Sequence, residues 1–177
     1  LHAVSVGEIM LIEKLAPLLR PRFPRHEFVV TTTTPQAYAL GQRRLAPAGM
    51  ALAWFPFDFP WLSDVFVRRL APAAVVMLET EIWPNFIAAC ARRGIPLFMA
   101  NGIVGAGEYR NYRLFRGFFV KLLNTYRLLV VQRAEDRERL LGLGVAPPKV
   151  IRLGNIKYDL SLPDDPRART ALRRALG

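Results

Sequence analysis

Two short acidic segments contain the side chains best suited to acid–base chemistry. The first, Ser5-Val-Gly-Glu8, follows a strand-like run and stands at the predicted start of a helix. Gly7 lets backbone N–H groups approach a ligand at this turn, and Glu8 could remove a proton from a hydroxyl group. A carboxylate in the first turn also stabilises the helix dipole, so Glu8 has a purely structural interpretation as well.

The second acidic segment, Glu79-Thr-Glu-Ile-Trp-Pro-Asn85, follows the apolar run Ala73–Leu78. Glu79 and Glu81 stand where a buried strand is expected to end. Either carboxylate could act as a general base or accept a hydrogen bond from a sugar hydroxyl. The alternative is a solvated helix start, and both interpretations stay open here.

Hydroxyl groups gather in the segment Thr31-Thr-Thr-Thr34-Pro35, at the end of another predicted strand. Thr33 and Thr34 could bind an acceptor hydroxyl. Because Pro35 suits the first position of a helix, an N-cap is the favoured interpretation of Thr34.

A basic and aromatic segment follows Asn101. Arg110, Arg113 and Arg116 are spaced by three residues, and aromatic residues interleave with them, namely Tyr109, Tyr112, Phe115, Phe118 and Phe119. One interpretation is an interfacial helix whose guanidinium groups contact lipid phosphates. The other is a helix that packs on a sheet and leaves its arginines in water.

These segments need a scaffold, and the chain alternates short apolar runs with longer helical patterns, as repeated βα units do. Strands are predicted near Ala3–Val6, Phe28–Thr32, Ala51–Phe55, Ala74–Leu78, Leu97–Ala100, Leu128–Val131 and Val150–Leu153. Helices are predicted near Gly7–Leu19, Pro35–Leu45, Trp61–Leu70, Trp83–Arg93, Tyr109–Asn124 and Ala134–Leu141. Several strands are apolar on both faces, so we expect an α/β fold with a parallel sheet covered by helices on both faces.

Composition points to an anionic partner. The 177 residues include 25 Lys and Arg against 14 Asp and Glu, a formal net charge of +11. An anionic membrane surface, a phosphorylated substrate or nucleic acid would each suit this charge, but no nucleic-acid-binding motif is present, so we expect no nucleic acid partner. No apolar run approaches the length of a membrane-spanning helix, so we expect any membrane contact of these residues to be peripheral.

Other familiar site signals are missing from the sequence. Gly105-Ala-Gly107 and Gly142-Leu-Gly144 do not continue into a dinucleotide-binding fingerprint. His2 and His26 have no neighbours at metal-ligand spacing, so no metal is predicted. The single cysteine, Cys90, lies in an apolar helical pattern and is expected to be buried.

Taken together, the motifs resemble those of one family, the Kdo transferases of lipopolysaccharide biosynthesis. The matching segments occur in family order over nearly the whole chain: His2-Ala-Val-Ser-Val-Gly-Glu8, Thr31-Thr-Thr-Thr-Pro35, Glu79-Thr-Glu-Ile-Trp-Pro-Asn85, Arg93-Gly-Ile-Pro96 and Gly154-Asn-Ile-Lys-Tyr-Asp159. One segment is divergent, because Ile103 stands where an arginine is usual and Gly105, Gly107 and Glu108 replace polar or basic residues.

The resemblance implies a GT-B glycosyltransferase with two Rossmann-like domains. The first domain, here residues 1–160, would bind the lipid A precursor, and residues 161–177 would be a linker or the start of the domain that binds the donor CMP-Kdo. Asn155 and Lys157 would lie in the passage between the domains. No cofactor is implied. The family also implies an upstream membrane anchor and a place on the cytoplasmic face of the bacterial inner membrane, with this part of the protein peripheral.

The resemblance also assigns roles to the residues introduced above. Glu8 becomes the candidate general base, and Glu79 and Glu81 become the second acidic site. The remaining acceptor-binding candidates are Ser5, Gly7, Thr33, Thr34 and Asn101. Competing hypotheses are another GT-B transferase acting on a lipid-linked acceptor and a basic peripheral domain that only binds anionic lipid.

Overall fold

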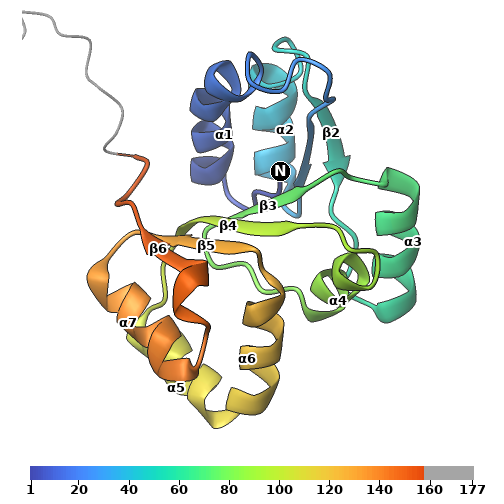
Figure 1. Cartoon of the computed structure of the whole chain (residues 1–177). Coiled ribbons are helices and arrows are strands. Elements are labelled where there is room, and N and C mark those ends of the chain that lie inside the picture. The colour runs from blue at the N-terminus through green and yellow to red at the C-terminus, as the bar shows by residue number, and fades with distance from the viewer. Residues whose placement is uncertain (158–177) are drawn as a thin grey trace, which may run out of the picture.

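A parallel β-sheet organises residues 1–157, the part of the chain that the computed structural model describes (Figure 1). β1 (Val29–Thr32) pairs with β2 (Ala51–Trp54). β3 (Val75–Leu78), β4 (Leu97–Gly102), β5 (Leu128–Val131) and β6 (Val150–Arg152) pair in that order. All of these pairings are parallel. The proposed boundary at residue 160 and the segment 161–177 lie outside the described residues.

Residues 1–3 lie between β1 and β3 and join the two groups of strands. The N–H of His2 donates to the carbonyl of Val76 at 2.8 Å, and the N–H of Ala3 donates to the carbonyl of Thr31 at 2.9 Å. The order across the sheet is therefore β2, β1, residues 1–3, β3, β4, β5 and β6. The first residues of the chain occupy a central position in this sheet.

The strand predicted at Ala3–Val6 is wrong in position. The chain leaves the sheet at Val4 because the Glu8 carboxylate accepts the backbone N–H groups of Val4 and Ser5, which removes them from strand pairing. Helix α1 then begins at Val6. The other six strands begin and end within about two residues of the predicted bounds, a common margin for element ends.

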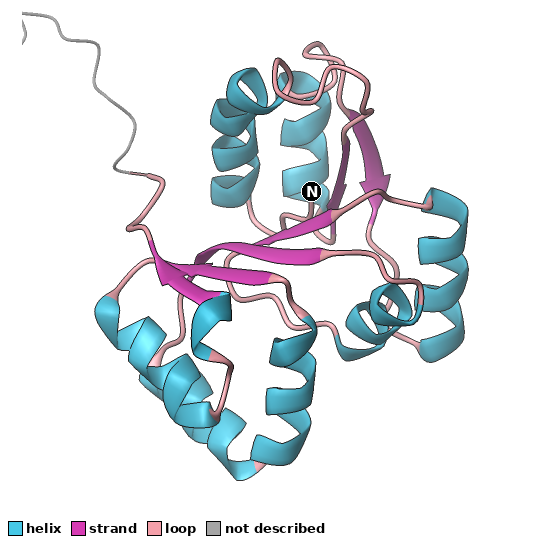
Figure 2. Cartoon of the chain, in the orientation of Figure 1, coloured by secondary structure: helices cyan, strands magenta, loops and turns pink. Residues whose placement is uncertain are grey.

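Helices cover both faces of the sheet (Figure 2). One face packs against α1 (Val6–Leu19) and α2 (Pro35–Arg44). The opposite face packs against α3 (Pro60–Leu70), α4 (Pro84–Arg92), α6 (Arg116–Thr125) and α7 (Ala134–Leu143). A short 3-10 helix, Pro147–Lys149, leads into β6. The predicted α/β architecture is confirmed.

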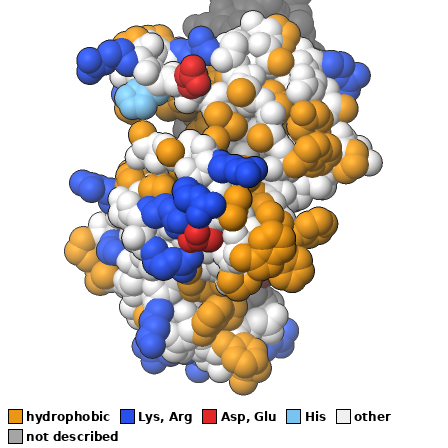
Figure 3. All heavy atoms as spheres, turned by 90° about the vertical axis from the view of Figure 1, so that its right-hand side faces the viewer, with side chains coloured by type: hydrophobic (Ala, Val, Ile, Leu, Met, Phe, Trp, Pro, Cys, Tyr) orange, Lys and Arg blue, Asp and Glu red, His pale blue; other side chains and the backbone are white. Residues whose placement is uncertain are grey.

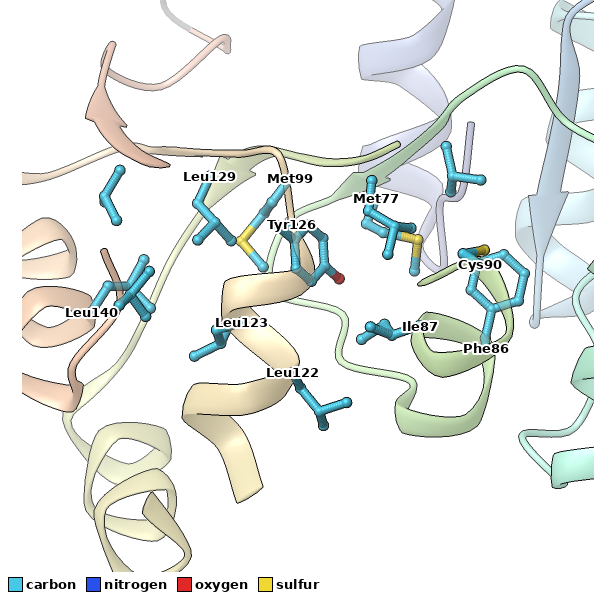
Figure 4. Close-up of a cluster of buried hydrophobic side chains, with 14 of the residues drawn as sticks. Met77, Phe86, Ile87, Cys90, Met99, Leu122, Leu123, Tyr126, Leu129 and Leu140 are labelled. Atoms are coloured by element: carbon cyan, nitrogen blue, oxygen red, sulfur yellow. The ribbon is translucent and has the colours of Figure 1, made fainter. Parts of the chain in front are cut away.

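The larger core lies beneath β3, β4 and β5. Figure 4 shows Met77, Met99 and Leu129 of these strands directed toward Ile87 of α4 and Leu123 of α6. Fully buried aliphatic side chains of this kind each contribute about 1.5–3 kcal/mol through burial. Cys90 also lies in this core, so its expected burial is confirmed, and burial raises the pKa of its thiol to about 12.

The single helix predicted over Tyr109–Asn124 is wrong, because the chain forms α5 (Ala106–Leu114) and α6 with a break at Phe115. The break lets α5 contact α7 while α6 turns back to α4. A straight helix could not make both contacts. Within residues 1–157, no helix has the length and apolar character needed to cross a membrane.

Candidate active site

The candidate site lies at the topological switch point of the sheet. Residues 1–3 and β3 are neighbours, but the chain passes from residues 1–3 to α1 on one face and from β3 to α4 on the other (Figure 1). In open parallel sheets, ligands bind in the crevice between two such connections, beyond the carboxyl ends of the strands. These two connections carry Glu8 and the acidic loop, which we define as residues 79–83.

Glu8 is only 3% exposed and closes a capping box at the start of α1. The N–H of Val4 donates to Oε2 at 2.9 Å, the N–H of Ser5 donates to Oε1 at 3.1 Å, and the N–H of Glu8 donates to the Ser5 hydroxyl at 3.2 Å. The structural interpretation of Glu8 is confirmed. Each carboxylate oxygen accepts one of these bonds and so retains capacity to accept another from a ligand.

Glu81 is the acidic-loop residue whose electrostatics depend on Glu8. Burial raises the pKa of the Glu81 carboxyl above its ordinary value, and the negative charges of Glu8 and Glu79 raise it further. The indole of Trp83 lowers the pKa of Glu81, although its N–H makes no hydrogen bond of regular geometry. The charges of two carboxylates, one from each connection, therefore act on Glu81.

Glu79 faces a basic partner. Its backbone is left-handed, with φ of 57°, and its N–H donates to the carbonyl of Ala100 at 2.9 Å. The carboxylate forms an ion pair with Lys157 at 3.4 Å, so the Gly154–Lys157 segment returns to the acidic loop. A left-handed glutamate costs about 1–3 kcal/mol and persists where the surrounding structure fixes it, often at functional sites.

Asn101, at the end of β4, is a second non-glycine residue in the left-handed region, with φ of 62°. Its side chain is fully buried, and its Oδ1 accepts the N–H of Ile156 at 3.1 Å. Its backbone carbonyl accepts a bond from the Gln132 side chain at 2.9 Å. Asn101 therefore anchors the returning segment close to Glu79, and its Nδ2 has no hydrogen-bond partner within residues 1–157.

The divergent loop after Asn101 is held by side chains outside it. The Thr80 hydroxyl accepts the N–H of Ile103 at 2.8 Å and also donates to the carbonyl of Ile103. The buried Asp136 carboxylate accepts the N–H of Val104 at 2.9 Å. At the start of α5, the Glu108 carboxylate lies close over Gly105, so a side chain at position 105 would require Glu108 to move. These contacts hold the loop in place.

The threonine segment has a structural role. The Thr34 hydroxyl accepts the N–H of Ala37 at 3.4 Å and donates to the carbonyl of Val4 at 2.8 Å, so the predicted N-cap is confirmed. Thr33 is partly exposed beside it. Ser5 is exposed and its hydroxyl serves the capping box, while Gly7 leaves open space at the turn.

The three arginines do not join the acidic site. Arg110 is exposed, Arg113 lies over the ring of Tyr109 at 5.9 Å, and the Nε of Arg116 donates to the carbonyl of Leu143 at 2.6 Å. Tyr112 of α5 is a partly buried neighbour of these arginines. Burial, with contributions from the charges of Glu108 and Glu81, raises the pKa of Tyr112 to about 12.

Sequence reasoning missed His2 as a buried residue beside the acidic loop. Its Nδ1 lies 3.0 Å from the Thr31 hydroxyl, and its ring stacks on Phe55 with centroids 4.0 Å apart. Trp83 packs edge-on against it at 6.2 Å. Burial lowers the pKa of His2 to about 3, so the ring is neutral at physiological pH. Its place in a strand-like run was the signal that could have indicated burial.

A cavity of about 860 Å³ lies away from the acidic site. It opens at the opposite, amino edge of the sheet, between the chain start, the Phe23–Phe28 segment and the end of α3. It contains none of the acidic residues described above, so the acid–base chemistry does not belong to it. Within the described residues, no three His, Cys, Asp or Glu side chains are grouped as metal ligands.

Comparison with known proteins finds relatives over nearly the whole chain. The chain is 29% identical to the 3-deoxy-D-manno-octulosonic acid transferase of Chlamydia muridarum (strain MoPn / Nigg), over 99% of this chain and 41% of the relative. It is 30% identical to the transferase of that name from Bordetella pertussis, over 92% of this chain and 38% of the relative. The chain thus spans about two fifths of the length of these curated relatives.

A solved structure shares the fold. UDP-N-acetylglucosamine 2-epimerase from Rickettsia bellii matches with a TM-score of 0.54 and 16% identity, over 89% of this chain and 44% of that one. This likeness supports the predicted Rossmann-like half of a GT-B protein.

Residues 1–160 match the sequence model of the family described as 3-Deoxy-D-manno-octulosonic-acid transferase (kdotransferase). The chain therefore belongs to the Kdo transferase family of glycosyltransferases.

Proposed function

We propose that the protein transfers Kdo from CMP-Kdo to a lipid A precursor, and that this chain supplies the acceptor site. The observation that carries the proposal is the placement of Glu8 and the acidic loop on the two connections that leave neighbouring positions of the sheet for opposite faces. A sugar hydroxyl has too high a pKa to attack efficiently at neutral pH, so a positioned carboxylate must take its proton as the bond to Kdo forms.

Glu8 is the proposed general base. Its capping-box bonds fix the carboxylate in one orientation, which lowers the entropic cost of placing it beside a hydroxyl. Glu81, whose pKa is raised, would bind another acceptor hydroxyl and can do so in its protonated or ionised form. Lys157 neutralises Glu79 and limits repulsion within the cluster.

Donor binding would use a second domain outside these residues, reached through Asn155 and Lys157. The donor is already activated as a CMP ester, so the proposal needs no cofactor. It follows that the isolated chain should fold without transferring Kdo, because catalysis requires both substrates to be held together. Kdo transfer by the purified 177-residue chain would contradict this part of the proposal.

The protein is further proposed to act at the cytoplasmic face of the inner membrane. Support comes from the tip between α5 and α6, where Leu114, Phe115 and Phe118 are exposed beside Arg110 and Arg113. Apolar side chains next to guanidinium groups suit an anionic lipid interface. Tyr109 and Tyr112 instead pack against the core, so only part of the aromatic set is available to lipid.

The central test is Glu8→Gln in the full-length protein. A general base should lose activity by about a hundredfold or more. Because Glu8 also caps α1, the change should cost about 0.5–2 kcal/mol of stability as well, so thermal unfolding must be measured alongside turnover. Glu13→Gln on the same helix is the matched control. Near-normal turnover in folded Glu8→Gln would remove Glu8 from this role.

A further inference from the structure

Three large aromatic side chains are exposed on the connection from β2 to α3 and on the first turn of α3, which begins at Pro60. Phe57 is 79% exposed, Phe59 is 57% exposed and Trp61 is 68% exposed. We define residues 57–61 as the aromatic loop. Exposed apolar side chains are ordinary when scattered singly, but three aromatic ones within five residues form a candidate interaction surface.

The aromatic loop is held rigidly by Asp58, which points inward. Its carboxylate accepts the backbone N–H groups of Asn85 at 3.0 Å and Phe86 at 2.8 Å, and the hydroxyl of Ser63 at 3.1 Å. Its backbone carbonyl accepts the Asn85 side chain at 2.5 Å. Because Asp58 faces the protein, burying its aromatic neighbours would require these bonds to break. The loop therefore presents its aromatic side chains with little freedom to retract.

Basic side chains adjoin the aromatic loop on α3 and α4. Asp64, one helical turn after Trp61, pairs with Arg92 at 3.0 Å and Arg93 at 2.7 Å. Two arginines against one aspartate leave a net positive charge, and Arg68 is exposed one turn farther along. Figure 3 shows hydrophobic and basic side chains side by side on the face formed by these helices.

We propose that the aromatic loop inserts into the interface of a bilayer containing anionic phospholipid, as a membrane contact separate from the α5–α6 tip. Aromatic rings enter the boundary between headgroups and acyl chains, while the neighbouring arginines meet lipid phosphates. A second copy of this chain fits less well, because a two-fold contact at this face would bring like charges together.

This contact would also orient the acidic site. Asp58 fixes the start of α4, and that helix directly follows the acidic loop. Membrane insertion at residues 57–61 would therefore place Glu79 and Glu81 near the bilayer. An acceptor embedded in the same bilayer could then reach them. The membrane contact does not depend on Kdo transfer, since it can be measured without donor or acceptor.

The first experiment compares vesicle binding of the 177-residue chain with that of Phe57→Ser/Phe59→Ser/Trp61→Ser. The vesicles contain phosphatidylethanolamine and phosphatidylglycerol, and binding is measured by co-sedimentation. Loss of three inserted rings should weaken binding by about tenfold or more. Met10→Ser/Leu18→Ser, which removes exposed apolar side chains from α1, is the matched control and should bind normally.

The second experiment uses Trp61, one of three tryptophans, as a depth probe. Lipids brominated on their acyl chains should quench part of the tryptophan fluorescence of the original chain when it binds vesicles. The quenched part should disappear in Trp61→Phe, a conservative change at an exposed position that leaves the fold intact.

Three results would overturn the proposal. One is unchanged vesicle affinity in the triple variant. Another is equal quenching in the original chain and in Trp61→Phe. The third is a triple variant that changes from dimer to monomer in sedimentation equilibrium while still binding vesicles, which would assign the loop to a second copy.

Discussion

The Thr80 hydroxyl accepts a hydrogen bond from the backbone N–H of Ile103 at 2.8 Å. Thr80 stands between Glu79 and Glu81, so this bond connects the acidic loop to the divergent loop after β4. The same hydroxyl donates to the carbonyl of Ile103. One side chain therefore sets the separation of the two loops.

Thr80→Val should disturb both loops with almost no change in volume. The variant loses two hydrogen bonds, and we expect a stability loss of about 1–3 kcal/mol by thermal unfolding. Turnover of the full-length protein should fall further than this loss explains, because the backbone between Glu79 and Glu81 would no longer be fixed to the neighbouring loop.

Thr125→Val provides the control, since the Thr125 hydroxyl also donates to a backbone carbonyl, that of Leu122, but at the end of α6. It should lose stability without a specific loss of turnover. Equal turnover in the two variants would show that Thr80 has no positioning role.

Glu81 should make stability depend on pH. Its pKa is raised in the folded protein above the ordinary 4.5. The folded state therefore holds this proton more tightly than the unfolded state, and stability falls as pH rises from about 4.5 through the raised pKa. Glu81→Gln removes this dependence, so it should be more stable than the original chain at neutral pH.

The measurement is the melting temperature of both chains over a series of pH values. The difference between them should shrink toward acid pH and grow toward neutral pH. Glu138→Gln, at an exposed position of α7, should show no such trend. A difference that is constant with pH would mean that Glu81 does not titrate in this window.

The arginines of α5 and α6 should separate into two classes. Arg110→Gln/Arg113→Gln should weaken binding to anionic vesicles by up to about 1 kcal/mol for each charge and reduce its salt dependence, with little effect on unfolding. Arg116→Gln should instead lose about 1 kcal/mol of stability, because Arg116 donates to the carbonyl of Leu143.

Arg22→Gln/Arg43→Gln removes the same charge from exposed positions elsewhere and serves as the control for the double variant. If both double variants bind vesicles equally weakly, net charge alone drives binding. The α5–α6 tip would then have no specific membrane role.

The sequence by itself determined the α/β class, most element bounds and the family. These features depend on local patterns, such as apolar runs of strand length and Pro35 after a capping threonine. Ordered motifs at strand ends also placed Glu8, Glu79 and Glu81 among the candidate residues. The structural role of Glu8 was likewise readable, because its capping partner Ser5 is only three residues away.

Only the tertiary structure decided which of these groups meet. The order of strands follows from pairing between distant segments, and that order puts residues 1–3 beside β3, so the connections that carry Glu8 and the acidic loop start from neighbouring positions. The Lys157–Glu79 ion pair and the inward Asp58 likewise depend on contacts across many residues. The break at Phe115 arises because α5 and α6 pack against different helices, a competition between distant contacts that no local periodicity encodes.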